Sequence, residues 1–257
     1  MDLSLLLKPI VSAFWWLIPL AIFACVFKSP WFKGIFGEML VRFSAKFLLD
    51  GEEYRAIHNV TLQTHDGTTQ IDHIFVSRYG IFVVETKNFS GWIFGDEGQA
   101  TWTQKLFKTS NKFQNPLRQN YKHVKTLEAV LGIPFEKFHS VVVFVGGSTF
   151  KTDMPPNVTY AGGYISYIKS KKHLLLSPSE VESIFESIEH GRLKPSMATT
   201  REHIRHVQSR SNTDTPRICP KCGNQMVFRT VKNRDRAGSA FWGCSQFPKC
   251  RAIQNVT

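Results

Sequence analysis

The sequence predicts an α/β domain between an apolar N-terminal segment and a cysteine-bearing C-terminal segment. Apolar residues recur at helical spacing from Glu38 to Leu49. Three runs rich in β-branched and aromatic residues follow, near 56–63, 71–77 and 81–87, and these predict strands. A second helical pattern and a further apolar run come next. The expected order of the core is therefore helix, three strands, helix and strand.

The first segment predicts a membrane anchor within residues 1–30. Pro9 through Phe27 is a stretch of 19 residues without a charged side chain, and a helix of that length just spans the hydrocarbon core of a bilayer. Lys8 precedes it, and four basic residues follow it: Lys28, Lys33, Arg42 and Lys46. By the positive-inside rule we expect a single-pass protein of the inner or cytoplasmic membrane with its C-terminal body in the cytoplasm. A cleaved signal peptide is the alternative, but no small-x-small cleavage site follows the apolar run.

The second and third predicted strands bring two carboxylates and a lysine together. Two apolar runs flank a short polar turn that ends at Gly80, which is typical of a β-hairpin. If the turn centres between Arg78 and Tyr79, Asp72 lies directly opposite Glu85, with Cβ atoms roughly 4.5–5.5 Å apart. A three-residue turn would make the two acids diagonal neighbours. Lys87 follows Glu85 by two residues and points to the same face.

This set of side chains suits metal-dependent phosphodiester cleavage. Carboxylate oxygens are the ligands that Mg²⁺ and Mn²⁺ prefer, and such a metal can polarise a phosphate and activate a water. An acid followed two residues later by a lysine is also common on solvated strand faces. Here, however, Glu85 and Lys87 follow a continuous apolar run, Ile81–Val84, of the kind found in strands buried on both faces.

The remaining elements are predicted from their end signals. Asn115-Pro116 predicts a helix N-terminus, and that helix should end at Gly132. Its expected apolar face consists of Leu117, Tyr121, Val124, Leu127 and Leu131. Residues 140–145 predict a buried strand. Ser177-Pro178-Ser179-Glu180 is a capping box that opens a helix ending at Gly191, and residues 195–216 have the composition of a flexible linker.

Four cysteines near the C-terminus predict a zinc ribbon over residues 217–257. Cys219 and Cys222 form one close pair, and Cys244 and Cys250 form another after 21 intervening residues. This spacing fits a tetrahedral, structural Cys₄ zinc site. Disulfides are the alternative, but they require an oxidising compartment, which the expected topology argues against.

The charge of the same segment indicates a nucleic-acid partner. Residues 217–257 contain eight Lys or Arg and one acid, a net charge of +7 out of +12 for the whole chain. Aromatic residues lie among these bases, where they could stack on nucleic-acid bases or form the core of the small ribbon. The candidate nucleic-acid-binding residues are Lys221, Arg229, Lys232, Arg234, Arg236, Trp242, Lys249 and Arg251.

The hairpin residues 70–73 and 80–91, with Asn115-Pro116-Leu117 downstream, resemble the nuclease-related domain (NERD) of the PD-(D/E)XK nuclease superfamily over roughly 34–150. The resemblance implies a restriction-endonuclease-like core with a mixed central sheet flanked by helices, in a domain that we place at 34–194. It implies Asp72 and Glu85 as ligands of a catalytic Mg²⁺ or Mn²⁺ and Lys87 as the catalytic lysine. It also suggests catalytic-site positions for three further residues: Glu38, Gln70 and Gln104.

The C-terminal ribbon is similar to the Cys₄ zinc fingers appended to type IA DNA topoisomerases. The similarity rests on Phe241-Trp242-Gly243-Cys244-Ser245 and Pro248-Lys249-Cys250. The chain has no tyrosine motif or acid cluster of the topoisomerase core, so only the accessory finger is shared. We therefore expect a membrane-anchored, Mg²⁺- or Mn²⁺-dependent nuclease whose ribbon binds DNA. The alternative is a non-catalytic nucleic-acid-binding or tethering protein that retains the nuclease fold.

Overall fold

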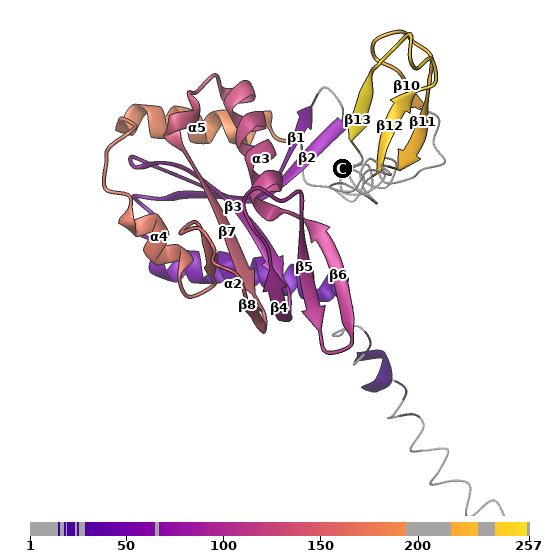
Figure 1. Cartoon of the computed structure of the whole chain (residues 1–257). Coiled ribbons are helices and arrows are strands. Elements are labelled where there is room, and N and C mark those ends of the chain that lie inside the picture. The colour runs from indigo at the N-terminus through magenta and orange to yellow at the C-terminus, as the bar shows by residue number, and fades with distance from the viewer. Residues whose placement is uncertain are drawn as a thin grey trace, which may run out of the picture. The chain divides into compact units, whose positions relative to one another are not determined.

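The computed structural model of the 257-residue chain describes residues 15, 18, 20–23, 25, 29–64, 67–193, 217–230 and 240–255 (Figure 1). The chain divides into two compact units. One comprises residues 1–60 and 71–191, and the other comprises residues 61–70 and 192–257. The candidate catalytic residues belong to the first unit, apart from Gln70, and the four clustered cysteines belong to the second.

A mixed five-stranded sheet has the order β1-β2-β3-β7-β9. These strands are β1 (Arg55–Thr64), β2 (Gly67–Ser77), β3 (Gly80–Asn88), β7 (Phe138–Val145) and β9 (Val158–Tyr160). β2 pairs with β3 in antiparallel fashion, whereas β7 is parallel to both β3 and β9. The predicted strands near 56–63, 71–77, 81–87 and 140–145 are thus confirmed, and the sheet is mixed, as expected.

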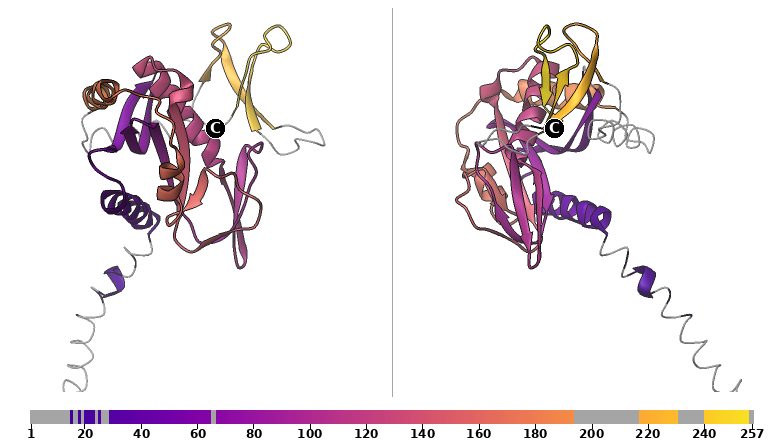
Figure 2. Two further views of the ribbon diagram at one scale, coloured as in Figure 1. Left: turned by 90° about the vertical axis from the view of Figure 1, so that its left-hand side faces the viewer. Right: turned by 45° about the vertical axis from the view of Figure 1, so that its right-hand side comes forward.

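Helices cover both faces of β3 and β7 (Figure 2). On one face, α2 (Pro30–Leu48) and α4 (Tyr164–Ser170) pack against inward-pointing side chains of the two strands, such as Phe82 and Val143. On the other face lies α3 (Pro116–Leu131). Its Asn120 side chain donates a hydrogen bond to the carbonyl of Val83. The buried strands are therefore apolar on both sides, which explains their continuous apolar runs.

Helix α2 begins eight residues before its predicted start at Glu38. The hydroxyl of Ser29 accepts a hydrogen bond from the Phe32 amide at 3.1 Å, and Pro30 occupies the first turn. Gly37 allows the helix to approach the sheet closely, because a Cβ there would lie 2.8 Å from Val145 Cγ2. Apolar periodicity does not predict this first half of the helix, because its apolar residues do not form a buried face. Ile35 and Phe36, for example, are exposed.

Helix α3 has the predicted ends but a different buried face. Asn115 caps its start at 2.9 Å from the Leu117 amide, and Gly132 ends it with φ +66°. The buried residues are Pro116, Asn120, His123, Val124 and Leu127. Tyr121, predicted on the inner face, is 53% exposed. Two polar side chains, Asn120 and His123, replace expected apolar ones on the inner face because they bind groups of the sheet.

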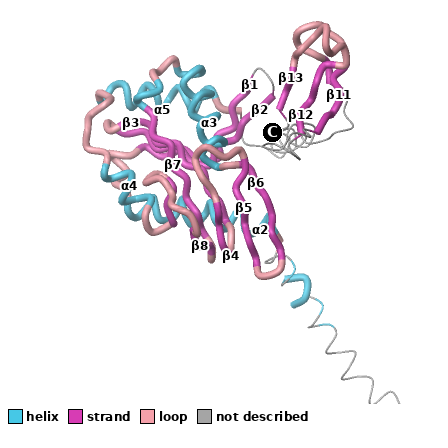
Figure 3. The backbone as a smooth tube through the Cα atoms, viewed as in Figure 1, coloured by secondary structure: helices cyan, strands magenta, loops and turns pink. Residues whose placement is uncertain are grey.

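A second, four-stranded sheet was not predicted. Its strands are β4 (Gly91–Phe94), β5 (Thr101–Leu106), β6 (Thr109–Gln114) and β8 (Ser148–Phe150), in the order β6-β5-β4-β8 (Figure 3). Short, polar strands such as β6 lack the apolar runs that mark the main sheet. One face of this second sheet packs on a core that contains Ile93, Trp102 and Phe144.

The two sheets are continuous through a glycine bend. The parallel pairing of β3 with β7 ends at Asn88 and Val145 and resumes between β4 and β8 at Gly91 and Ser148. Gly91 and Gly146 adopt φ +80° and +86° at this bend. A Cβ on Gly146 would lie 2.7 Å from the Phe89 carbonyl oxygen, so a larger residue could not occupy this position without displacing the backbone.

The predicted capping box opens α5 (Pro178–Gly191). Ser177 Oγ accepts a hydrogen bond from the Glu180 amide at 3.2 Å, and the Glu180 carboxylate accepts one from the Ser177 amide at 2.7 Å. A 3₁₀ turn, η1 (Phe135–Lys137), precedes β7. Helix α5 ends at Gly191, as expected.

The C-terminal ribbon is a four-stranded antiparallel sheet. Its strands are β10 (Arg217–Ile218), β11 (Gln225–Thr230), β12 (Ala240–Cys244) and β13 (Ile253–Asn255), paired in chain order. Cys219, Met226, Trp242 and Cys244 form its small core.

Most of the predicted anchor and all of the predicted linker at 195–216 lie outside the described residues. Among the helices that the structure does describe, none is both long enough and apolar enough to cross a bilayer.

Candidate active site and metal centre

The β2–β3 hairpin has the register that places Asp72 opposite Glu85. Ser77 pairs with Gly80 and His73 pairs with Val84, so the turn contains two residues, Arg78 and Tyr79. Asp72 is the next residue of β2 beyond the last pair. Its Oδ2 accepts a hydrogen bond from the Thr86 amide at 2.8 Å, which fixes the carboxylate beside Glu85. The predicted two-residue turn is confirmed, and the three-residue turn that would make the two acids diagonal neighbours is excluded.

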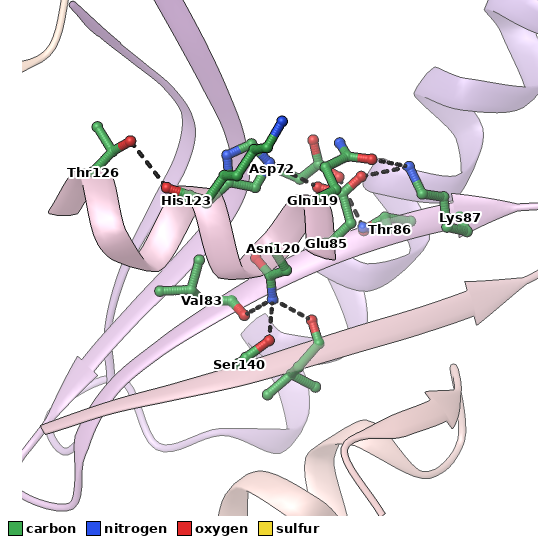
Figure 4. Close-up of polar contacts among 12 residues, drawn as sticks. Asp72, Val83, Glu85, Thr86, Lys87, Gln119, Asn120, His123, Thr126 and Ser140 are labelled. Atoms are coloured by element: carbon green, nitrogen blue, oxygen red, sulfur yellow. Dashed lines mark hydrogen bonds and ion pairs between the residues drawn. The ribbon is translucent and has the colours of Figure 1, made fainter. Parts of the chain in front are cut away.

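Glu85 is the centre of the site. It is 3% exposed, and each of its oxygens has a basic neighbour. Lys87 Nζ lies 2.6 Å from Oε1, and His123 Nε2 lies 3.2 Å from Oε2. Lys87 also donates to Gln119 Oε1 at 2.9 Å. Figure 4 shows Gln119 and His123 projecting from α3 toward the carboxylate and the lysine.

Gln119 and His123 are site residues that the sequence reasoning missed. They lie four residues apart, so they occupy one face of α3 a single turn from each other. The signal was present as a polar pair at helical spacing after the Asn115-Pro116 cap. Apolar periodicity does not reveal this pair, because it assigns the inner face of a helix to its apolar residues.

A buried amide holds α3 against the two central strands. Asn120 Nδ2 donates to the Val83 carbonyl at 2.8 Å, to Ser140 Oγ at 2.9 Å and to the Val141 carbonyl at 3.1 Å (Figure 4). These acceptors belong to β3 and β7, close to Glu85. The helix is therefore fixed in position and rotation, and Gln119 and His123 are directed at the site.

The electrostatics of the three acids differ. Burial raises the pKa of Asp72 well above its usual range, and the charge of Glu85 raises it further. Burial would also raise the pKa of Glu85, but Lys87 and then His123 outweigh it and hold that pKa at about 2. Burial, followed by the charge of Glu85, raises the pKa of Glu38. Glu85 is thus the ionised member of the group, and a cation would favour ionisation of the other two.

Glu38 is electrostatically coupled to Asp72 and Glu85, and it extends from α2. The three carboxylates do not meet at one point, since within the described ranges only the cysteines form a group of three or more metal-ligating side chains. Gln104 does not join the acids, because its amide donates to the Ser90 carbonyl at 2.8 Å. Gln70 lies on β2 two residues before Asp72 and is half-buried. The donor chemistry of the acids fits a hard divalent cation.

The four cysteines of the ribbon converge as a ligand set. Their Sγ atoms all lie within 4.8 Å of one another, with Cys219 and Cys250 at 3.7 Å and Cys222 and Cys244 at 3.4 Å. Tetrahedral thiolates at a Zn–S distance of about 2.3 Å would have sulfurs about 3.8 Å apart, so the cluster fits structural zinc. No disulfide links these cysteines, all of which are free.

Four of the candidate nucleic-acid-binding residues are exposed: Lys221, Arg229, Lys249 and Arg251. Lys232, Arg234 and Arg236 lie outside the described residues. The prediction for Trp242 is corrected. Its side chain is 4% exposed and packs with the cysteines and Met226, because a ribbon this small has few other apolar groups for its core. Phe228 and Phe247, at 40% and 57% exposure, are the accessible rings.

Comparison with known proteins agrees with both parts of this description. The sequence model of the nuclease-related domain matches residues 33–145, and that of the topoisomerase DNA-binding C4 zinc finger matches residues 216–257. A Bacillus anthracis protein described as uncharacterised is 40% identical over 166 residues, which cover 62% of this chain and 76% of that protein. The chain therefore belongs to the family of proteins that carry a nuclease-related domain.

Proposed function

We propose that this protein is a divalent-metal-dependent nuclease that hydrolyses phosphodiester bonds in DNA. The observation that carries the proposal is the placement of Lys87 at 2.6 Å from the buried Glu85, with Asp72 in the facing position of the hairpin. A buried acid beside a lysine and a second, half-buried acid is costly to maintain in a fold, and such groups cluster at functional sites.

Asp72 and Glu85 would hold Mg²⁺ or Mn²⁺, with Glu38 as a further carboxylate from α2. When bound, the cation supplies polarisation of the phosphate and activation of a water. Lys87 carries a positive charge for the developing charge on the phosphate, and Gln119 orients it through the 2.9 Å hydrogen bond. His123 orients Glu85 from the other side.

The other parts of the proposal concern delivery and location. The exposed bases of the ribbon would bind DNA through its phosphates, and structural zinc would hold the ribbon together. Residues 1–30 would anchor the protein in the cytoplasmic membrane, with the two units in the cytoplasm.

Conservative variants of the acids test the catalytic proposal. Asp72→Asn and Glu85→Gln should each lower Mg²⁺-supported cleavage of plasmid DNA at least about a hundredfold, because metal and water activation are lost together. Lys87→Ala should keep metal binding, measured by titration calorimetry, but lose rate. Glu186→Gln, on the exposed face of α5, is the matched control and should remain fully active. Full activity of both acid variants would contradict the site.

A second candidate, a non-catalytic nucleic-acid-binding protein, is favoured by one observation. Both oxygens of Glu85 already have basic neighbours within the protein, Lys87 and His123. If the protein is non-catalytic, the wild type should bind DNA but cleave none of a panel of single- and double-stranded substrates with Mg²⁺ or Mn²⁺. Calorimetry should then detect no binding of either metal beside the acids.

A further inference from the structure

One face of the sheet formed by β4, β5, β6 and β8 lies outside the core. Trp92 of β4 pairs with Lys105 of β5, and Thr103 of β5 pairs with Lys112 of β6. Paired residues of antiparallel strands share a face, as do residues two apart in one strand. Trp92, Lys105 and Lys112 are therefore on one face, and all three are exposed. The alternate residues, including Ile93 and Trp102, belong to the core.

Lys151 completes this surface, which we call the lysine face and define by Trp92, Lys105, Lys112 and Lys151. The chain continues the edge of the sheet beyond β8, with the Lys151 amide bonded to the Ile93 carbonyl at 2.9 Å. Lys151 Nζ lies 4.7 Å from the centre of the Trp92 ring, and Trp92 is 48% exposed. The cation and the aromatic ring are thus presented to solvent together.

The lysine face is positive because its strands contain no acids. None of the 19 residues in β4, β5, β6 and β8 is Asp or Glu. The nearest acids in sequence lie in the adjoining loops, at Asp96, Glu97 and Asp153. A sheet face that carries lysines without balancing acids is not explained by stability, since like charges on neighbouring strands repel one another.

The tip of the β5–β6 hairpin carries an exposed aromatic residue in an unfavourable backbone conformation. Phe107 is 95% exposed and has φ +22°, although Gly, Asn or Asp is usual where a two-residue hairpin turn requires positive φ. Lys108 beside it has its Nζ 5.7 Å from the ring centre. A large apolar side chain held out in a strained conformation is expected where it has a partner to contact.

We propose that the lysine face and the Phe107–Lys108 tip form a second DNA-binding surface, within the nuclease-related unit and separate from the zinc ribbon. This inference rests on the proposed function and specifies how its substrate is held. Lysines on two strands and at the sheet edge beyond β8 match the repeating charge of a duplex backbone. A two-stranded ribbon such as β5–β6 has dimensions that enter the major groove. Phe107 would then contact the groove.

The test compares two triple variants of the full chain with equal changes in charge. The test variant is Lys105→Gln/Lys112→Gln/Lys151→Gln. The control is Lys46→Gln/Lys169→Gln/Lys172→Gln, which alters exposed lysines outside the second sheet. Affinity for a 30-base-pair duplex is measured across salt concentrations by fluorescence anisotropy, without added divalent metal and without chelator, so that zinc stays in the ribbon and no cleavage occurs.

The test variant should bind at least about tenfold more weakly at 0.1 M salt, and its slope of log K against log salt should be shallower by about 2 to 3, because each phosphate contact contributes about 0.9. The control should change affinity by less than about twofold and keep the slope. Unchanged binding in the test variant, or equal weakening in both variants, would overturn the inference.

The readout separates this inference from the proposed function. If the wild type cleaves no substrate in Mg²⁺, the proposed function fails, but the comparison of binding still stands. Phe107→Ser should weaken binding without changing the salt slope, since it removes no charge. A membrane is the other partner that a basic, aromatic tip could meet. Loss of binding to phosphatidylserine vesicles by the test variant and by Phe107→Ser, with DNA affinity unchanged, would refute the DNA assignment.

Discussion

Individual side chains in the main sheet show how position on a strand determines charge state. Asp72 and His73 are neighbours on β2, yet they point to opposite faces. His73 is 1% exposed, and its Nδ1 lies 2.9 Å from Nδ1 of His58 on β1. Burial lowers the pKa of His73 to about 3 and that of His58 to about 4. The two rings are therefore neutral at pH 7 and pack within the sheet away from the acids.

These two histidines should make stability depend on pH. Their pKa values in the folded chain lie below the ordinary value near 6.5, so the unfolded chain binds more protons as pH falls. The free energy of unfolding should decrease from about pH 6.5 toward pH 4, by up to about 1.4 kcal/mol per pH unit for each histidine. Urea unfolding of the wild type and of His58→Gln/His73→Gln at several pH values measures this. An equally steep decrease in the double variant would assign the effect to other groups.

At the scale of elements, the position of α3 depends on one amide. Asn120 makes three hydrogen bonds to β3 and β7, and the residues on either side of it in the helical turn, Gln119 and His123, contact Lys87 and Glu85. The same helix therefore completes the core and the site. A helix held only by apolar contacts could rotate slightly without a large change in free energy, whereas these bonds have a defined direction.

Replacing Asn120 with Leu should reduce both stability and activity. The change removes three hydrogen bonds between the helix and the two strands, which contribute about 0.5–1.5 kcal/mol each. Urea denaturation should show a total loss of about 2–4 kcal/mol. Thr126→Ala, at a half-buried position of the same helix whose hydroxyl donates to the Lys122 carbonyl, should cost no more than about 1 kcal/mol. If Asn120→Leu kept full DNA cleavage at a temperature where it remains folded, Asn120 would not be needed to position the site.

The sequence was most informative where a pattern is local. The two-residue turn at Arg78 and Tyr79, the Asn115 cap and the Ser177 capping box all depend on neighbouring residues, and all were confirmed. The second sheet was missed because β4 and β8 are short and pair with each other although they are more than 50 residues apart in sequence. The inner face of α3 was assigned incorrectly in part, since a buried Asn or His is recognisable only from its partners on other elements.

At the scale of the whole molecule, the two units should respond differently to loss of zinc. The ribbon has a core of only a few residues, so its folding free energy must come largely from metal binding, whereas the nuclease-related unit has an extensive apolar core. Cys222→Ser should therefore lower the zinc content, measured by atomic emission under reducing conditions, from one per chain and make residues 217–257 sensitive to protease.

The core of the nuclease-related unit should survive this change. Its thermal unfolding, and its cleavage of short DNA at high concentration, should match those of the wild type. Cys25→Ser is the control, because Cys25 is not part of the four-cysteine cluster and its loss should leave the zinc content unchanged. Full zinc content in Cys222→Ser would show that the four sulfurs are not the ligand set.

The glycine bend between β3 and β4 has a consequence for where DNA would be cut. Lys87 and Trp92 are five residues apart on one run of chain, so their Cα atoms can be at most about 18 Å from each other. Each strand of B-DNA advances about 3.4 Å per base pair, so this reach corresponds to about five base pairs. The hydrogen bond from the Gly91 amide to the Gly147 carbonyl, 3.0 Å long, keeps the intervening segment from extending freely. If DNA binds at Trp92 and is cut beside Lys87, the cut should therefore lie within about five base pairs of the nucleotides that contact Trp92.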